Sequence, residues 1–201
     1  MTARIAALPL SDRGYPVPFF VDYIDGKPEF RAMDPKKFRA CVRQNLCWVC
    51  GQTLGRYKCF AIGPMCAVNR ISSEPPSHVD CAEWSAKACP FLSNPNMVRR
   101  EQGLPEDRRS AGVMVKRNPG VTLLWTVTRY EIEKVSNGVL FSLQDPENVS
   151  WWCESRPATR SEVEASVAGG LSLLESACKS DQERVELAAL VHKAEAYYPV
   201  P

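Results

Sequence analysis

The 201-residue sequence has only two histidines, no long apolar run and almost no net charge. No stretch approaches the ~18 consecutive apolar residues of a membrane-spanning helix, so the sequence excludes one. A formal net charge of +2 gives no overall argument for nucleic-acid binding. Residues 1–10 hold one arginine and a short apolar patch broken by Pro9, without the apolar core of a secretory signal. We therefore expect a cytoplasmic protein.

Motifs of several common enzyme classes are also missing. Gly169-Gly170 lies inside a helical pattern, and no Walker-type lysine follows it. The chain has no Gly-x-Ser-x-Gly elbow and no His-x-Glu paired with Pro-Cys-x-x-Cys, the pattern of nucleobase deaminases. The absence of these motifs favours a function other than catalysis but does not exclude an enzyme.

Hydrophobic periodicity and turn residues predict an α+β fold, because helical and strand patterns follow one another without a regular βαβ alternation. The 45% apolar content is that of an ordinary globular protein. In the N-terminal half we expect a hairpin over 15–33 around Asp25-Gly26, a helix over 35–44, a strand over 56–62 and a helix over 78–88 capped by Ser77. A short helix is expected near 97–102. A strand over 121–135 should turn at Asn137-Gly138 to pair with 139–143, and another strand should cover 149–153. Two C-terminal helices, from Thr159 and from about Asp181, should form an αα-hairpin.

This order divides the chain into three parts. Residues 1–92 form the hairpin and a metal-binding region, 93–120 form a connecting segment rich in Pro, Gly and basic residues, and 121–201 form antiparallel strands followed by the helical hairpin. The length suits one compact unit overall.

The nine cysteines are concentrated in one region, with seven of them between Cys41 and Cys89. An odd number without an export signal argues against a disulfide framework and for metal binding or buried thiols. The isolated Cys153 and Cys178 are expected to be small core hydrophobes.

The most specific motif is Cys47-x-x-Cys50-Gly51, followed after 27 residues by His78-x-x-Cys81. Two cysteines in a tight knuckle can direct both sulfurs at one ion, and the next glycine permits the turn. His78 and Cys81 lie three residues apart in the first turn of an expected helix, hence on one face. The order of knuckle, strand and ligand-bearing helix over residues 45–90 resembles a treble-clef zinc finger. Three thiolates and one imidazole favour a structural Zn²⁺ with no open position.

Three alternatives for this motif stay open. Cys66, after a turn at Gly63-Pro64, could replace His78 in an all-cysteine site. An iron–sulfur cluster held by Cys47, Cys50, Cys66 and Cys81 is chemically feasible. The residues could also be buried free thiols beside a surface histidine.

Two further features suggest contact surfaces. Basic residues are concentrated in the connecting segment, where they could contact phosphates, or could line a solvated linker: Arg99, Arg100, Arg108, Arg109, Lys116 and Arg117. Trp151 and Trp152 cannot both point inward from one strand, so one of them marks a candidate partner-binding surface.

Three segments also resemble uncharacterised proteins of phages and bacterial genomes. They are Cys47-Trp-Val-Cys-Gly51, the pair Gly63-Pro-Met-Cys-Ala-Val-Asn-Arg70 and Glu74-Pro-Pro-Ser-His-Val-Asp-Cys81, and Ala88-Cys-Pro-Phe-Leu92. The resemblance covers most of the N-terminal half and implies a phage or mobile-element context, but no activity.

The leading hypothesis is a cytoplasmic, zinc-stabilised binding module whose partner is nucleic acid or a host protein. The rival is an enzyme with a cleft beside the zinc finger, using Arg70, His78, Asp80 and Glu83. A third possibility is a structural or inhibitory protein that docks on a host factor through Trp151-Trp152 and the helical hairpin. The sequence does not predict the oligomeric state.

Overall fold

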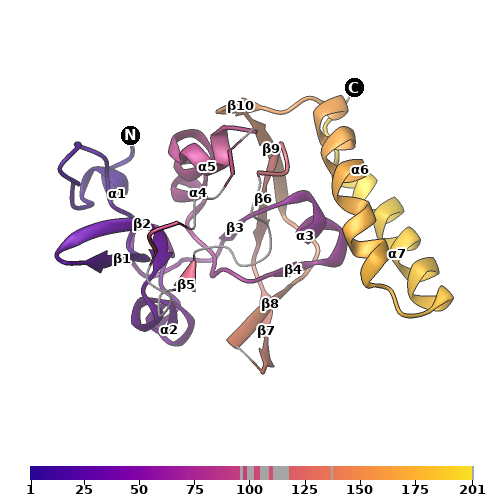
Figure 1. Cartoon of the computed structure of the whole chain (residues 1–201), viewed down its shortest axis with the longest axis horizontal. Coiled ribbons are helices and arrows are strands. Elements are labelled where there is room, and N and C mark those ends of the chain that lie inside the picture. Colours follow the sequence, from indigo (N-terminus) through magenta and orange to yellow (C-terminus); the bar gives the residue numbers. More distant parts are fainter. Residues whose placement is uncertain (96, 99–101, 105–108, 111–117, 137, 201) are drawn as a thin grey trace.

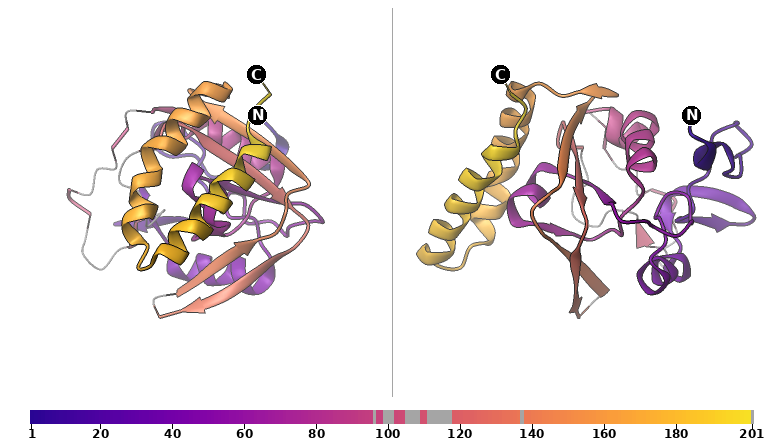
Figure 2. Two further views of the ribbon diagram at one scale, coloured as in Figure 1. Left: turned by 90° about the vertical axis from the view of Figure 1, so that its right-hand side faces the viewer. Right: turned by 180° about the vertical axis from the view of Figure 1, so that it is seen from behind.

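The computed structural model describes residues 1–95, 97–98, 102–104, 109–110, 118–136 and 138–200. In this part of the chain, helices combine with antiparallel sheets, as the α+β prediction requires. Figure 1 shows a hairpin and short helices at one end, a central sheet, and two long helices at the other end. The right-hand view in Figure 2, seen from behind, shows the same order of layers. None of the helices described here is long and apolar enough to span a bilayer.

The central sheet has four strands in the order β10-β9-β6-β3. Its members are β3 (Lys58–Ile62), β6 (Thr122–Val127), β9 (Asn148–Cys153) and β10 (Arg156–Pro157). Every residue of β6 is buried, because α4 (Val79–Ala88) packs near one face and the main core lies on the other. A strand covered on both faces reads as a continuous apolar run rather than as an alternating pattern.

Two smaller sheets flank the central one. The first has the order β1-β2-β5 and contains β1 (Val21–Ile24), β2 (Lys27–Met33) and β5 (Arg109–Ser110). The second has the order β4-β8-β7 and contains β4 (Ile71–Ser72), β7 (Tyr130–Val135) and β8 (Gly138–Leu143). The hairpin predicted at Asp25-Gly26 is confirmed, with Ile24 paired to Lys27.

The prediction of one strand over 121–135 is wrong. The stretch forms β6 and β7, which lie in different sheets and are separated by Thr128 and Arg129. Periodicity did not reveal the break because both halves are rich in β-branched and aromatic residues. The return pairing of β7 with 139–143 is confirmed, with Tyr130 opposite Leu143.

Helix starts follow their capping residues. α2 (Pro35–Gln44) begins after Asp34, whose carboxylate accepts hydrogen bonds from the backbone N–H groups of Lys36 and Lys37. α6 (Arg160–Ala177) begins with a capping box between Thr159 and Glu162, and α7 (Asp181–Ala194) is capped by Ser180. A short 3-10 turn, η1 (Glu195–Tyr197), follows α7.

Three helical details differ from the sequence prediction. Gly63-Pro64 ends a strand, as expected, and also begins α3 (Pro64–Asn69), with proline in the first turn. The short helix is α5 (Pro90–Ser93), and the described residues within 97–102 are not helical. The third is the cap of α4, which is His78 instead of Ser77. A further short helix, α1 (Ala3–Ala6), lies near the N-terminus.

The main core lies between the central sheet, β8 and α6. Its largest members are Phe60, Trp125, Phe141 and Trp151, with Val163 on α6. The indole N–H of Trp125 donates a 3.0 Å hydrogen bond to the Gln144 carbonyl, which satisfies its one buried polar group.

Candidate metal centre

The side chains of Cys47, Cys50, His78 and Cys81 converge on one point. One ligand atom from each residue lies within 4.8 Å of all the others. A tetrahedron with metal–sulfur bonds of about 2.3 Å has sulfurs roughly 3.8 Å apart, so the four groups need only a small adjustment to share an ion. The cluster could therefore hold a metal ion.

The knuckle follows directly from the end of α2. Asn45 terminates the helix in the left-handed conformation, and its backbone then pairs with Leu54. The Gly51 N–H donates a 2.8 Å hydrogen bond to the Cys47 carbonyl, which closes the turn between the two cysteines. Gly51 itself has φ +72°, a region that side-chain-bearing residues rarely adopt. The glycine of the sequence motif therefore serves the turn, as predicted.

We expect Gly51→Ala to destabilise the knuckle by more than the ~1 kcal/mol typical of a left-handed alanine. An added Cβ would lie 2.6 Å from a ring carbon of Phe19, so the aromatic ring must also move. Urea unfolding and metal content would measure the effect. Gly55→Ala is the matched control, because a Cβ added there would meet nothing within 4 Å and Gly55 has no positive φ. Equal losses in the two variants would contradict this account of Gly51.

The second ligand pair is placed by a bridge to the central sheet. Ser77 exchanges two 2.8 Å backbone hydrogen bonds with Cys59 on β3. Its N–H and carbonyl are therefore used in strand pairing, and α4 starts after His78 instead. His78 occupies the cap position and Cys81 the first helical turn. Both side chains then face the knuckle.

His78 is oriented to offer Nδ1 to the cluster. Nδ1 lies 3.4 Å from Cys50 Sγ and 4.0 Å from Cys81 Sγ, while Nε2 lies 3.1 Å from the Thr53 carbonyl oxygen. A carbonyl oxygen only accepts, so this contact assigns a proton to Nε2, and the neutral tautomer with that proton directs its Nδ1 lone pair at the two sulfurs. Metal-ligating histidines are oriented in this way by a hydrogen bond from the other ring nitrogen.

The cluster favours a thiolate at Cys47. A hydrogen bond from the Cys81 thiol lowers the pKa of Cys47, and backbone N–H groups that include those of Cys50 and His78 act in the same direction. The same shared hydrogen bond raises the pKa of Cys81, and burial raises that of Cys50. These interactions favour ionisation of Cys47 over ionisation of Cys50 or Cys81. A bound cation would favour ionisation of all three.

An apolar cover surrounds the cluster. Ile5 of α1 is fully buried and packs with Leu8, Val49 and Leu54 against Cys47 and Cys81, and Trp84 of α4 joins them. Arg4 of α1 forms a 3.0 Å ion pair with Asp80, the residue before Cys81. The N-terminal segment therefore covers the site and limits access of water to it.

The other cysteines lie outside this group. Cys66, the alternate ligand suggested by the sequence, lies on α3 and packs against the main core. Burial raises its pKa, and it raises the pKa of Cys41 and Cys59 to about 12, so these groups remain neutral thiols. Cys153 lies in the main core as expected, and Cys178 is half-buried beside the C-terminal helices.

No family model, curated protein or solved structure matches this chain. The functional interpretation therefore rests on the residues of the chain itself.

The candidate nucleic-acid residues of the connecting segment are largely outside the described residues. Five of them are not among the described residues: Arg99, Arg100, Arg108, Lys116 and Arg117. Arg109 lies on β5, with its backbone paired to Met33. Their proposed role stays a prediction.

The two adjacent tryptophans face opposite sides of β9. Trp151 is only 4% exposed, and its indole N–H donates a 2.8 Å hydrogen bond to the Tyr197 carbonyl. Trp152 is partly buried against the α4 side of the sheet, with Lys87 Nζ 4.6 Å from its ring centre. Trp151 is thus covered by the C-terminal segment, and of the pair only Trp152 is partly accessible.

The polar residues of the rival enzyme hypothesis interact with different neighbours. Arg70 stacks 4.5 Å from the ring centre of Trp125 and pairs with Asp145 at 3.1 Å. Asp80 pairs with Arg4, as described above. Glu83 lies on α4, near the Cys59 thiol. These interactions hold Arg70 and Asp80 in separate ion pairs.

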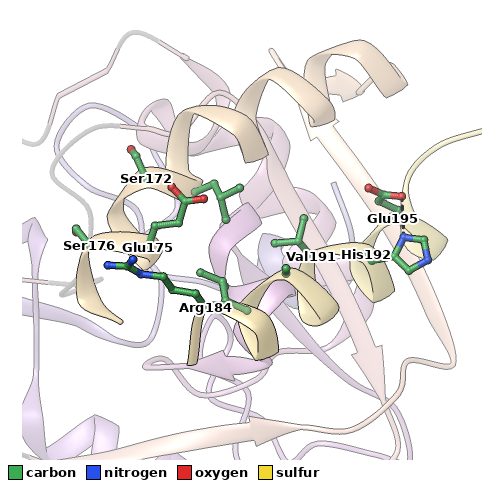
Figure 3. Close-up of a pocket in the computed structure, with 10 residues that line it drawn as sticks. Ser172, Glu175, Ser176, Arg184, Val191, His192 and Glu195 are labelled. Carbon is green, nitrogen blue, oxygen red and sulfur yellow. Dashed lines mark ion pairs between the residues drawn. The ribbon is translucent and has the colours of Figure 1, made fainter. Parts of the chain in front are cut away.

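A groove of about 610 Å³ lies between α6 and α7, and none of the four clustered cysteine and histidine residues lines it. Figure 3 shows Ser172, Glu175 and Ser176 on one side and Arg184 and Val191 on the other. The sequence did not single out this groove. Its polar lining residues are exposed side chains of α6, α7 and the turn that follows α7.

Proposed function

We propose that this protein is a zinc-stabilised binding module. In this proposal Cys47, Cys50, His78 and Cys81 hold one Zn²⁺, with a treble-clef-like order of knuckle, strand and helix. The orientation of His78 carries the proposal, because its Nδ1 faces two sulfurs while its Nε2–H is directed at the Thr53 carbonyl. Four protein ligands would complete a tetrahedron and leave no position for a substrate water, which supports a structural role.

The donor set also bears on the identity of the metal. Thiolate and imidazole groups together suit Zn²⁺ well, whereas the iron–sulfur alternative required Cys66 in place of the histidine. Cys66 packs against the main core and is not one of the four grouped residues. A Zn²⁺ site uses the four residues as the structure groups them, whereas an iron–sulfur cluster would need Cys66 in place of His78.

A structural ion also explains how this region folds. The cluster is enclosed by a small apolar group around Ile5, Val49 and Leu54, separate from the main core. So small a group buries little apolar surface, and a bound ion would supply the missing folding free energy. The folded module would then present its surface to nucleic acid or to a protein.

Elemental analysis of the purified full-length protein tests this proposal. We expect close to one zinc per chain, and loss of near-UV circular dichroism after chelation with restoration by added Zn²⁺. Iron together with acid-labile sulfide would favour the cluster alternative. A metal-free protein with unchanged near-UV spectrum and thermal stability would refute the proposal.

A further inference from the structure

Charge is strongly segregated along the chain around the knuckle. Between Asp34 and Glu74 the sequence contains no acidic residue. The same stretch holds seven basic residues: Lys36, Lys37, Arg39, Arg43, Arg56, Lys58 and Arg70. Four of them lie on the ten-residue helix α2. This helix ends directly before the metal-ligating knuckle.

Three of the four basic residues of α2 share one exposed face. Lys36, Arg39 and Arg43 are spaced i, i+3 and i+7, which places them along one side of a helix. All three are exposed. Across the helix, Cys41 is buried and Phe38 packs edge-on against Trp48, with ring centres 5.7 Å apart. The helix is therefore fixed on the core with its charges outward.

The three charges have no partner within the described chain. The ion pairs of the described residues involve other basic side chains. The fourth basic residue behaves differently: Lys37 Nζ donates a 2.7 Å hydrogen bond to the Val21 carbonyl and lies 5.1 Å from the ring centre of Tyr23. Lys37 is thus used in packing, whereas Lys36, Arg39 and Arg43 are available to a ligand.

We propose that the face of α2 formed by Lys36, Arg39 and Arg43 binds the phosphate backbone of a double-stranded nucleic acid. This inference rests on the proposed function, because the knuckle that would hold the metal begins two residues after the α2 cap Asn45. The three residues span about 10 Å of helix axis at 1.5 Å per residue. A duplex carries about one negative charge per 1.7 Å, so roughly six phosphates lie along that length.

The composition of the face favours a duplex over other anionic partners. The exposed residues of α2 are Pro35, Lys36, Arg39, Arg43 and Gln44. No aromatic ring is among them, so the helix offers no platform for stacking unpaired bases. It also lacks the exposed aromatic or large aliphatic residues that form the centre of a protein–protein interface. A row of single positive charges along one face of α2 complements the regular row of phosphates in a duplex.

Salt-dependent binding of full-length protein tests the inference. The probe is a fluorescein-labelled 20-base-pair DNA duplex, with an RNA duplex, single-stranded DNA of equal length and polyglutamate as parallel arms. The variant combines Lys36→Gln, Arg39→Gln and Arg43→Gln. The control combines Lys134→Gln, Lys179→Gln and Lys193→Gln, which removes three exposed charges outside α2. Metal content and circular dichroism are measured for every protein.

We expect the α2 variant to lower the slope of log K against log salt by about 2.7 in magnitude, at ~0.9 per phosphate contact. Its affinity at 50 mM salt should fall roughly tenfold or more, while the control binds nearly like the wild type. The DNA and RNA duplex arms then show which duplex is bound.

Equal slopes for wild type and α2 variant would overturn the inference, and so would absence of wild-type binding at low salt. Tighter binding to the single strand, or equal binding to polyglutamate, would overturn the choice of a duplex. If the wild type, the α2 variant and the control variant all bind a full complement of zinc, a negative result in the binding experiment concerns α2 alone. The proposed metal centre would then stay intact. Missing zinc in the wild type would instead refute the proposed function.

Discussion

Cys50→Ser should lose most of the metal that we propose for the cluster and should unfold its N-terminal half at lower temperature than the wild type. The sulfur of Cys50 is 3.4 Å from His78 Nδ1, so its loss removes one of the four proposed ligands from the cluster. A structural zinc site contributes on the order of 10–16 kcal/mol in isolated fingers, and an even share for one ligand is about 3 kcal/mol. Elemental analysis and thermal unfolding would measure both effects.

Cys178→Ser is the matched control for this change. Cys178 is half-buried, lies at the end of α6, and its thiol interacts with the Leu174 carbonyl at 3.4 Å. A serine hydroxyl can keep that hydrogen bond, so metal content should stay near one per chain. Similar losses of metal and solubility in the two variants would count against the ligand assignment.

Trp151→Ala should cost about 3–5 kcal/mol of unfolding free energy, the usual range for removing a large aromatic ring from a core. Trp151 packs edge-on against Tyr198, with ring centres 6.0 Å apart, and its indole N–H is bonded to the Tyr197 carbonyl. The change therefore leaves a cavity and releases the segment after α7 from the central sheet. Urea unfolding followed by circular dichroism would measure the loss.

Two companion variants separate packing from partner binding. Trp151→Phe keeps an apolar ring but leaves the Tyr197 carbonyl without its donor, which should cost less, about 1–3 kcal/mol. Trp152→Ala should cost less than Trp151→Ala, because Trp152 is only partly buried. If Trp151→Ala were as stable as the wild type, that result would instead agree with a surface role for Trp151.

Elements set by local chemistry were predictable from the sequence. The helix after Asp34-Pro35, the turn at Asp25-Gly26 and the capping box at Thr159 depend on neighbouring residues, and all three are observed. The break between β6 and β7 was not predictable. It depends on which sheet each half joins, and this is decided by contacts with distant strands such as β3 and β8. Short-range periodicity carries no such information.

The same distinction applies to the site. The spacing of the two ligand pairs indicated four residues that the fold brings together. The start of α4 was misplaced by one residue because Ser77 is a good cap by composition, while its backbone is engaged by Cys59. The cover formed by Ile5 could not be inferred, since it joins residues more than forty positions apart. The basic face of α2 was detectable from its spacing and from the absence of acidic residues, but overall net charge concealed it.

The spacing of the two ligand pairs has one more consequence for the central sheet. An ion held by Cys50 and His78 would cross-link the chain around the 27 residues between them, a loop that includes β3, the edge strand paired with β6. Closing a loop of this length removes unfolded-state entropy worth about 3.6 kcal/mol in the cross-link model. Chelation should therefore speed amide hydrogen exchange along Lys58–Ile62, although that strand supplies no ligand.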